Sequence, residues 1–209
     1  MQDRFYNIDE QRRWNEDYMW ENDGHEWSHM FGNTDNLWNK QIFPHIKEFR
    51  GRKVVEIAPG RGRITQYLSI LTSELTVVDL NPTCIDITRN KLGEHVKSYI
   101  VNDGKSLPGI LSNSQDLVIS WDSFVHMHRN VIDDYLKEIS RVLVEGGKGY
   151  IHHSWLWDGS EYSTNNISGR SNMTPQLFAE MVTSHGMKMV NQFNLTFPEV
   201  TDTVSIFTK

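Results

Sequence analysis

The stretch KVVEIAPGRGRITQYLSIL, residues 53–71, decides the fold of this chain. Its first part, KVVEIA at 53–58, is a short apolar run that predicts a buried strand, and RITQYLSIL at 63–71 has the apolar spacing of a helix. Gly60 and Gly62 stand between them and allow a tight turn that brings a ligand close to the backbone. A strand, a glycine turn and a helix in this order predict the first crossover of a parallel sheet.

The same alternation continues along the chain. We expect further strands at 74–80, 97–101, 116–121 and 148–154, and helices at 82–92, 130–143 and 175–185. Two strand candidates close the chain, MKMVNQFNLTF and TVSIFTK, with Pro198 and Asp202 as turn residues between them. We therefore expect an α/β, Rossmann-like fold. Its doubly wound, mostly parallel seven-stranded sheet has an antiparallel C-terminal hairpin and a helical N-terminal cap.

Length and composition favour a single domain, 1–209, in the cytoplasm. We divide it into an N-terminal helical cap or lid at 1–50 and a core at 51–209. Within the cap we expect a helix with Thr34 as its N-cap that ends at Gly51. The single cysteine fits a reducing compartment. We find neither an apolar leader nor the roughly 18-residue apolar run of a membrane span. The net charge of −6 argues against a nucleic-acid partner.

Acidic residues stand near the carboxyl ends of the first three expected strands, within them or just after them. Glu56 and Ala58 open the pattern E-x-A-x-G-x-G, but Thr65 stands where a dinucleotide fingerprint needs a glycine or alanine. An acid beside this turn repels a pyrophosphate and suits a ligand with positive charge. Asp79 ends the second strand and Asp103 follows the third. A carboxylate at Asp79 is able to accept hydrogen bonds from both hydroxyls of a ribose.

In this order, the motifs resemble those of class I S-adenosylmethionine-dependent methyltransferases, over about residues 50–209. The resemblance implies S-adenosylmethionine as cofactor and S-adenosylhomocysteine as product. It also implies Asp79 on the ribose and Asp103 beside the adenine. The stretch LVEGGKG keeps two glycines of a family motif, Gly146 and Gly147, but lacks its proline. The cofactor-binding residues implied are Glu56, Ala58, Gly60, Gly62, Asp79, Leu80, Asn102, Asp103, Gly104 and Trp121.

The stretch SWDSFVHMH at 120–128 follows the fourth strand, where the resemblance places the methyl group. His126 is the first catalytic candidate, because histidine can take a proton from a hydroxyl near neutral pH. A structural, hydrogen-bonded His126 is the alternative. Asp122 and His152 are the other catalytic candidates. His152 and His153 are neighbours on one strand, so one should face the site and the other should face away.

The acceptor is the least defined part of this prediction. The acidic chain favours a hydroxyl or amine of a small metabolite or glycan precursor, sugar-like or phosphorylated. We expect Trp27, His153, Trp155 and Arg170 to bind this substrate, with Arg170 as an anion clamp. The polar loop 155–173 is a candidate lid, although an ordinary solvated loop is equally compatible with its composition. The oligomeric state is not defined by the sequence.

The segment HEWSH at 25–29 matches the H-E-x-x-H pattern of zinc peptidases. Gly24 and Gly32 bracket it and leave a helix of only seven residues, so we expect no metal site. In the methyltransferase interpretation, this aromatic segment folds over cofactor and substrate, or simply caps the sheet edge. A zinc peptidase, a nicotinamide-dependent oxidoreductase and a non-catalytic S-adenosylmethionine-binding protein remain as alternatives.

Overall fold

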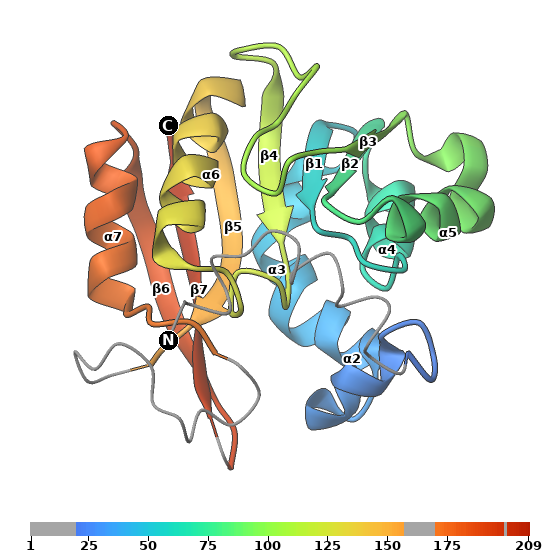
Figure 1. The fold of residues 1–209 in the computed structure, drawn as a ribbon, viewed down its shortest axis with the longest axis horizontal. Helices are drawn as coiled ribbons and strands as arrows, with labels where there is room; N and C mark the ends of the chain where they lie inside the picture. The colour runs from blue at the N-terminus through green and yellow to red at the C-terminus, as the bar shows by residue number, and fades with distance from the viewer. Residues whose placement is uncertain (1–19, 157–169, 199) are drawn as a thin grey trace.

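The computed structural model describes residues 20–156, 170–198 and 200–209, and these residues build one seven-stranded sheet flanked by helices (Figure 1). The strand order is β3-β2-β1-β4-β5-β7-β6. β7 pairs antiparallel with both β5 and β6, and the other pairs are parallel, which confirms the predicted sheet. The strands are β1 (Lys53–Ile57), β2 (Glu74–Asp79), β3 (Ser98–Val101), β4 (Gln115–Ser120), β5 (Leu143–Ser154), β6 (Lys188–Thr196) and β7 (Thr201–Thr208).

Local sequence signals fix where the longer helices begin. Pro82 and Pro175 occupy first-turn positions, where the missing N–H costs nothing. The side chains of Asn81 and Thr174 accept hydrogen bonds from the first turns as N-caps. In Figure 1, α6 and α7 lie side by side near β5 and β6, and α5 lies at the β3 end of the sheet. The helices are α4 (Thr65–Leu71), α5 (Pro82–Leu92), α6 (Arg129–Val142) and α7 (Pro175–Ser184), with a short turn η4 (Gly93–His95) after α5.

Before β1, a short 3₁₀ helix is followed by helical turns that run without a break from Thr34 to Phe49, as expected for this stretch, although the type of turn changes along it. Asn33 is the N-cap, because its side chain accepts from the Asn36 N–H at 2.7 Å. Thr34, the expected cap, instead donates to the Ser28 hydroxyl at 2.9 Å. Pro44 has no N–H to donate, and the turn before it widens to a π-helical one. The elements are η1 (His25–Phe31), α2 (Thr34–Leu37), η2 (Trp38–Ile42), α3 (Phe43–Ile46) and η3 (Lys47–Phe49).

Two hydrophobic clusters cover opposite faces of the sheet, because adjacent strand residues point to opposite sides. Val54 belongs to the cluster that includes residues from α2, η2, α4 and α5. Val55 belongs to the cluster that includes residues from α6 and α7. Among the helices described here, none combines the length and the apolar composition needed to cross a bilayer.

The sheet changes its direction of growth between β1 and β4. β2 and β3 lie on one side of β1, and the chain then crosses over to place β4 on the other side. In open α/β sheets, ligands bind beyond the carboxyl ends of the strands at such a switch point. The fold therefore gathers the residues that follow β1, β2, β4 and β5 around one region.

Candidate functional site

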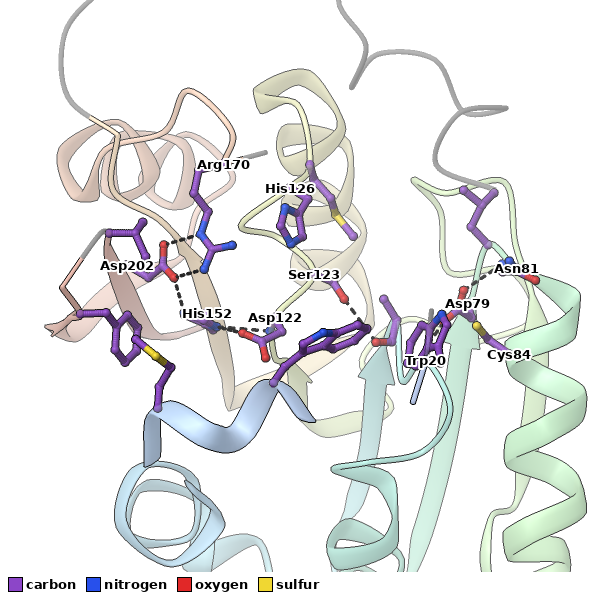
Figure 2. A pocket seen from close by; sticks show the side chains of 18 of the residues that line it. Trp20, Asp79, Asn81, Cys84, Asp122, Ser123, His126, His152, Arg170 and Asp202 are labelled. Atoms are coloured by element: carbon purple, nitrogen blue, oxygen red, sulfur yellow. Dashed lines mark hydrogen bonds and ion pairs between the residues drawn. The ribbon is translucent and has the colours of Figure 1, made fainter. Parts of the chain in front are cut away.

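A cavity of about 550 Å³ lies at the carboxyl ends of the parallel strands, within the size range of small-molecule sites. We call its two parts the β2 side and the β5 side. Figure 2 shows Asp79, Asn81 and Cys84 on the β2 side and Asp122, His152, Asp202 and Arg170 on the β5 side, with Ser123 and His126 between them.

The turn after β1 presents backbone to the β2 side. Ala58 and Gly60 have φ values of 55° and 57°, a left-handed conformation that is strained for the alanine. The Gly60 N–H donates to Asp79 Oδ2 at 3.2 Å, and the Asn81 N–H donates to Oδ1 at 2.8 Å. Burial raises the pKa of Asp79 to about 6, although these N–H groups lower it. Each carboxylate oxygen keeps lone-pair capacity for a ligand hydroxyl.

The loops after β2 and β3 complete the β2 side. Leu80 and Gly104 line the cavity, and a Cβ on Gly104 would lie 3.3 Å from the Leu80 side chain. Asn102 is buried behind them, where it accepts from the Gly104 N–H at 3.0 Å and donates to the Tyr135 hydroxyl at 2.9 Å. Asp103 is exposed and accepts hydrogen bonds from the following backbone in an Asx turn. Asn102 and Asp103 therefore organise the loop rather than the cavity wall.

Glu56 and Gly62 do not line the cavity, where we expected them. Gly62 has a φ of 89°, in the left-handed region that favours glycine, so it permits the tight turn. Glu56 is 3% exposed, and its Oε2 has no hydrogen-bond partner among the described residues. Burial raises the pKa of Glu56 to about 8, so the carboxyl is mostly protonated at neutral pH.

The β5 side is built from five ionisable side chains in series. Arg63 pairs with Asp122, and Asp122 Oδ1 lies 3.1 Å from His152 Nδ1. His152 Nε2 lies 3.4 Å from Asp202 Oδ2. Arg170 donates to both oxygens of Asp202 through Nε and Nη2, at 3.0 and 2.7 Å. We call this series, Arg63–Asp122–His152–Asp202–Arg170, the charge chain.

Two carboxylates enclose the buried His152 imidazole. Burial lowers the pKa of His152, but the hydrogen bonds and charges of Asp122 and Asp202 outweigh it and raise that pKa. Burial likewise acts to raise the pKa of Asp122, yet the Arg63 charge and His152 hold it well below its usual range. Asp122 also has a φ of 61°, which is rare for a residue with a Cβ. The charge chain thus holds an ionised carboxylate in a strained conformation on the cavity wall.

The loop after β4 presents Ser123 and His126 between the two sides (Figure 2). The Ser123 hydroxyl donates to the Ala58 carbonyl at 3.3 Å, which joins this loop to the glycine turn. The backbone N–H of His126 donates to the Ser123 carbonyl at 3.0 Å. His126 is on the wall, as expected. Trp121 is 5% exposed and stacks on His152 with ring centroids 4.3 Å apart, so it supports the wall from behind.

Trp27 and Arg170 line the cavity, and their role in binding substrate stays a prediction. The planar fork of Arg170 is, however, engaged by Asp202, which weakens the argument for an anion clamp. Most of the loop that we expected to form a lid, 157–169, lies outside the described residues.

His153 and Trp155 lie away from the cavity, in contrast to the expectation that both bind substrate. His153 is fully buried on the opposite face of β5, where it stacks on Phe178 at 4.1 Å and bonds to the Ser205 hydroxyl at 2.8 Å. This follows from the alternation of side chains along a strand, since His152 faces the cavity. Trp155 follows the end of β5 and is 38% exposed.

The two histidines of HEWSH have separate partners. His25 Nδ1 lies 2.7 Å from the Thr34 hydroxyl, and His29 Nδ1 donates to the Glu26 carbonyl at 2.9 Å. The segment forms a 3₁₀ helix, in which residues four apart no longer lie on one face. Across the described ranges, no cluster of three histidine, cysteine or carboxylate side chains is placed to hold a metal.

Residues 20–31, which we call the strap, form one edge of the cavity. The Trp20 ring rests on the glycine turn, and a Cβ on Gly60 would lie 2.8 Å from it. Asp23 pairs with Lys91 of α5 at 2.7 Å and with Arg61 at 3.7 Å. The aromatic content of this segment was its signal in the sequence.

Among the residues that line the cavity, Asp202 differs most from its sequence-based prediction. We read it as a turn residue, whereas it is fully buried at the start of β7. Arg63 and Tyr135 were also not anticipated. Arg63 lies in the turn before α4 and Tyr135 lies in α6, in stretches that we expected to be helical and whose pattern indicates only packing. A charged residue inside an apolar strand was the available signal for Asp202.

Comparison with known families gives one domain match. The model of the family described as "Methyltransferase domain" matches residues 54–147, which run from β1 into β5. Among curated proteins, the sequence comparison finds no match.

Several solved structures share the fold. A TehB-like SAM-dependent methyltransferase from Corynebacterium glutamicum is 21% identical, with a TM-score of 0.59 over 77% of this chain and 81% of that one. An S-adenosylmethionine-dependent methyltransferase from Clostridium acetobutylicum is 13% identical, with a TM-score of 0.65 over 88% and 97%. The [4+2]-cyclase SpnF is 13% identical, with a TM-score of 0.65 over 84% and 80%. At these identities the likeness establishes the fold alone.

Proposed function

We propose, from the match of residues 54–147 to the methyltransferase-domain family model, that the chain transfers a methyl group from S-adenosylmethionine to a hydroxyl or amine of a small metabolite. The observation that carries this proposal is the buried Asp79 carboxylate on the wall, fixed by the Gly60 N–H. When bound, S-adenosylmethionine supplies an electrophilic methyl group on a sulfonium. Asp79 and the left-handed turn at Ala58 and Gly60 suit its ribose hydroxyls and a close approach to backbone.

Three side chains near the switch point have distinct proposed roles. His126, on the wall between the two sides, orients the acceptor or takes its proton. Asp122 is held ionised by Arg63 and His152, so it provides fixed negative charge and not proton uptake. His152 faces a carboxylate at each ring nitrogen, and we propose that it positions Asp122. In this scheme residues 51–209 act as the catalytic core and residues 1–50 as its cap.

Binding of the cofactor tests the proposal without knowledge of the acceptor. Calorimetry with S-adenosylmethionine should show binding to the full-length protein and a loss of at least about tenfold in affinity for Asp79→Asn, which removes charge-assisted hydrogen bonds. Asp103→Asn is the matched control, because Asp103 is exposed in its own Asx turn, and it should bind as the wild type does. A mass gain of one methylene across a panel of metabolites then tests turnover. Absence of cofactor binding by the folded wild type would refute the proposal.

A further inference from the structure

We propose that the methyl acceptor has a compact apolar body, aromatic or branched aliphatic, with one polar group, and is not a polyhydroxylated sugar. This inference rests on the proposed function and names the substrate class of the same site. It follows from the lining of the cavity, which apolar side chains from two distant segments share with members of the charge chain. We call these side chains the apolar wall; they are Met30, Phe31, Phe197, Pro198 and Val200.

The apolar wall is formed by the strap and by the connection between β6 and β7. Phe31 and Phe197 meet edge to face with centroids 5.6 Å apart, and Phe31 also lies 6.0 Å from Trp121. These contacts hold the two segments in a defined geometry with aromatic faces and edges available for packing. A flat or branched apolar group is the natural complement of such a surface.

Part of the apolar wall is left open to solvent. Met30 is 41% exposed and belongs to the few large apolar side chains that the described surface exposes. A ligand that contacts Met30 would remove this apolar surface from water, which favours binding of an apolar group. Met30 is unbranched and adaptable, so it suits contact with a bound small molecule.

The charged groups that line the same cavity as the apolar wall are already engaged with one another. Asp202 accepts two hydrogen bonds from Arg170 and faces His152, while Asp122 pairs with Arg63 and His152. A ligand with many hydroxyls would lose its water there and compete with existing charge-assisted bonds for new partners. An apolar body with one polar group, directed to Ser123 and His126, avoids that cost.

Ligand-observed NMR on the full-length protein tests this, with and without S-adenosylhomocysteine, using two matched pairs of probes. The first pair is benzylamine and glucosamine, which both carry an amine, and the second pair is phenol and methyl glucoside, which both carry a hydroxyl. Each pair therefore compares an aromatic body with a polyhydroxylated one. We expect the aromatic member to bind at least about tenfold more tightly. We expect Met30→Ser and Phe197→Ser to reduce that preference by several fold. Val190→Ser is the control, because Val190 is an exposed apolar residue of β6 outside the cavity wall.

The outcomes separate this inference from the proposed function. The apolar acceptor would be overturned if the two members of each pair bind equally, if the sugars bind more tightly, or if no aromatic probe binds. It would also be overturned if both wall variants keep the preference of the wild type. Calorimetry with S-adenosylhomocysteine on the same samples tests the proposed function on its own. Cofactor binding without an aromatic preference therefore contradicts the acceptor class alone, and aromatic preference without cofactor binding contradicts the methyltransferase proposal alone.

Discussion

Replacing Glu56 by glutamine should abolish a pH dependence of folding stability that this single carboxyl creates. Glu56 is buried on β1, and burial raises its pKa from the ordinary 4.5 to about 8. Between these two values the folded protein retains a proton that the unfolded chain releases. Stability therefore falls as the pH rises from about 4.5 to about 8.

The size of the effect follows from the same two values. One pKa unit corresponds to about 1.4 kcal/mol, so a pKa raised from 4.5 to about 8 corresponds to at most about 5 kcal/mol of unfolding free energy. Glutamine has nearly the same volume and never ionises. The unfolding free energy of the variant, relative to that of the wild type, should therefore rise steadily through this pH range and stay constant above it.

Urea unfolding followed by tryptophan fluorescence, at steps between pH 5 and pH 9, measures this difference. Other groups titrate in this range, but subtracting the wild-type curve from the Glu56→Gln curve isolates Glu56. Glu145→Gln is the control, because it changes an exposed acid of β5 by the same chemistry. Parallel pH curves for the wild type and the Glu56 variant would refute the reasoning that burial keeps this carboxyl protonated.

Three further predictions follow from the site. His126→Asn should lower turnover by about 10²–10⁴ with a hydroxyl acceptor, because the proton acceptor is lost, while calorimetry shows unchanged cofactor affinity. Asp23→Asn should make cofactor dissociation about two- to fivefold faster in stopped-flow fluorescence, because the ion pair between Asp23 and Lys91 holds the strap against α5. The control is Asp133→Asn, which removes a remote ion pair, and equal dissociation rates for the two variants would contradict this prediction. Elemental analysis should find far less than one zinc per chain, and one zinc lost in His25→Ala would reverse that expectation.

The sequence predicted the sheet well because its signals are local. Apolar runs, Pro82 and Pro175 at helix starts and the glycines after β1 act over a few residues, and the observed elements agree with them to within a few residues, except that β5 begins earlier. The helix expected before β1 is also present, since helical turns run without a break from Thr34 to Phe49 and only widen to a π-helical turn before Pro44.

The site was predicted less completely, because its contacts join distant segments. Asp79 and His126 lie on the wall because their places after β2 and β4 follow from the topology. Asp202 joins the site only through the pairing of β7 with β5, and no local pattern indicates which residue of β7 faces His152. Asp103 follows a strand as Asp79 does, yet its side chain turns back to its own loop. Spacing alone does not distinguish these two outcomes.

The charge chain also favours the correct register of β7 against β5 during folding. In the antiparallel pairing, His153 lies opposite Thr203 and His152 lies opposite Val204. The two histidines point to opposite faces of the sheet, so His152 contacts charged groups while His153 packs on Phe178. A slip of β7 by one residue would reverse which of its side chains faces each side of the sheet. Asp202 would then lose both of its cationic partners inside the protein, a strongly unfavourable outcome. The same side chains that form one wall of the cavity thereby make a misaligned hairpin unstable, before any ligand is bound.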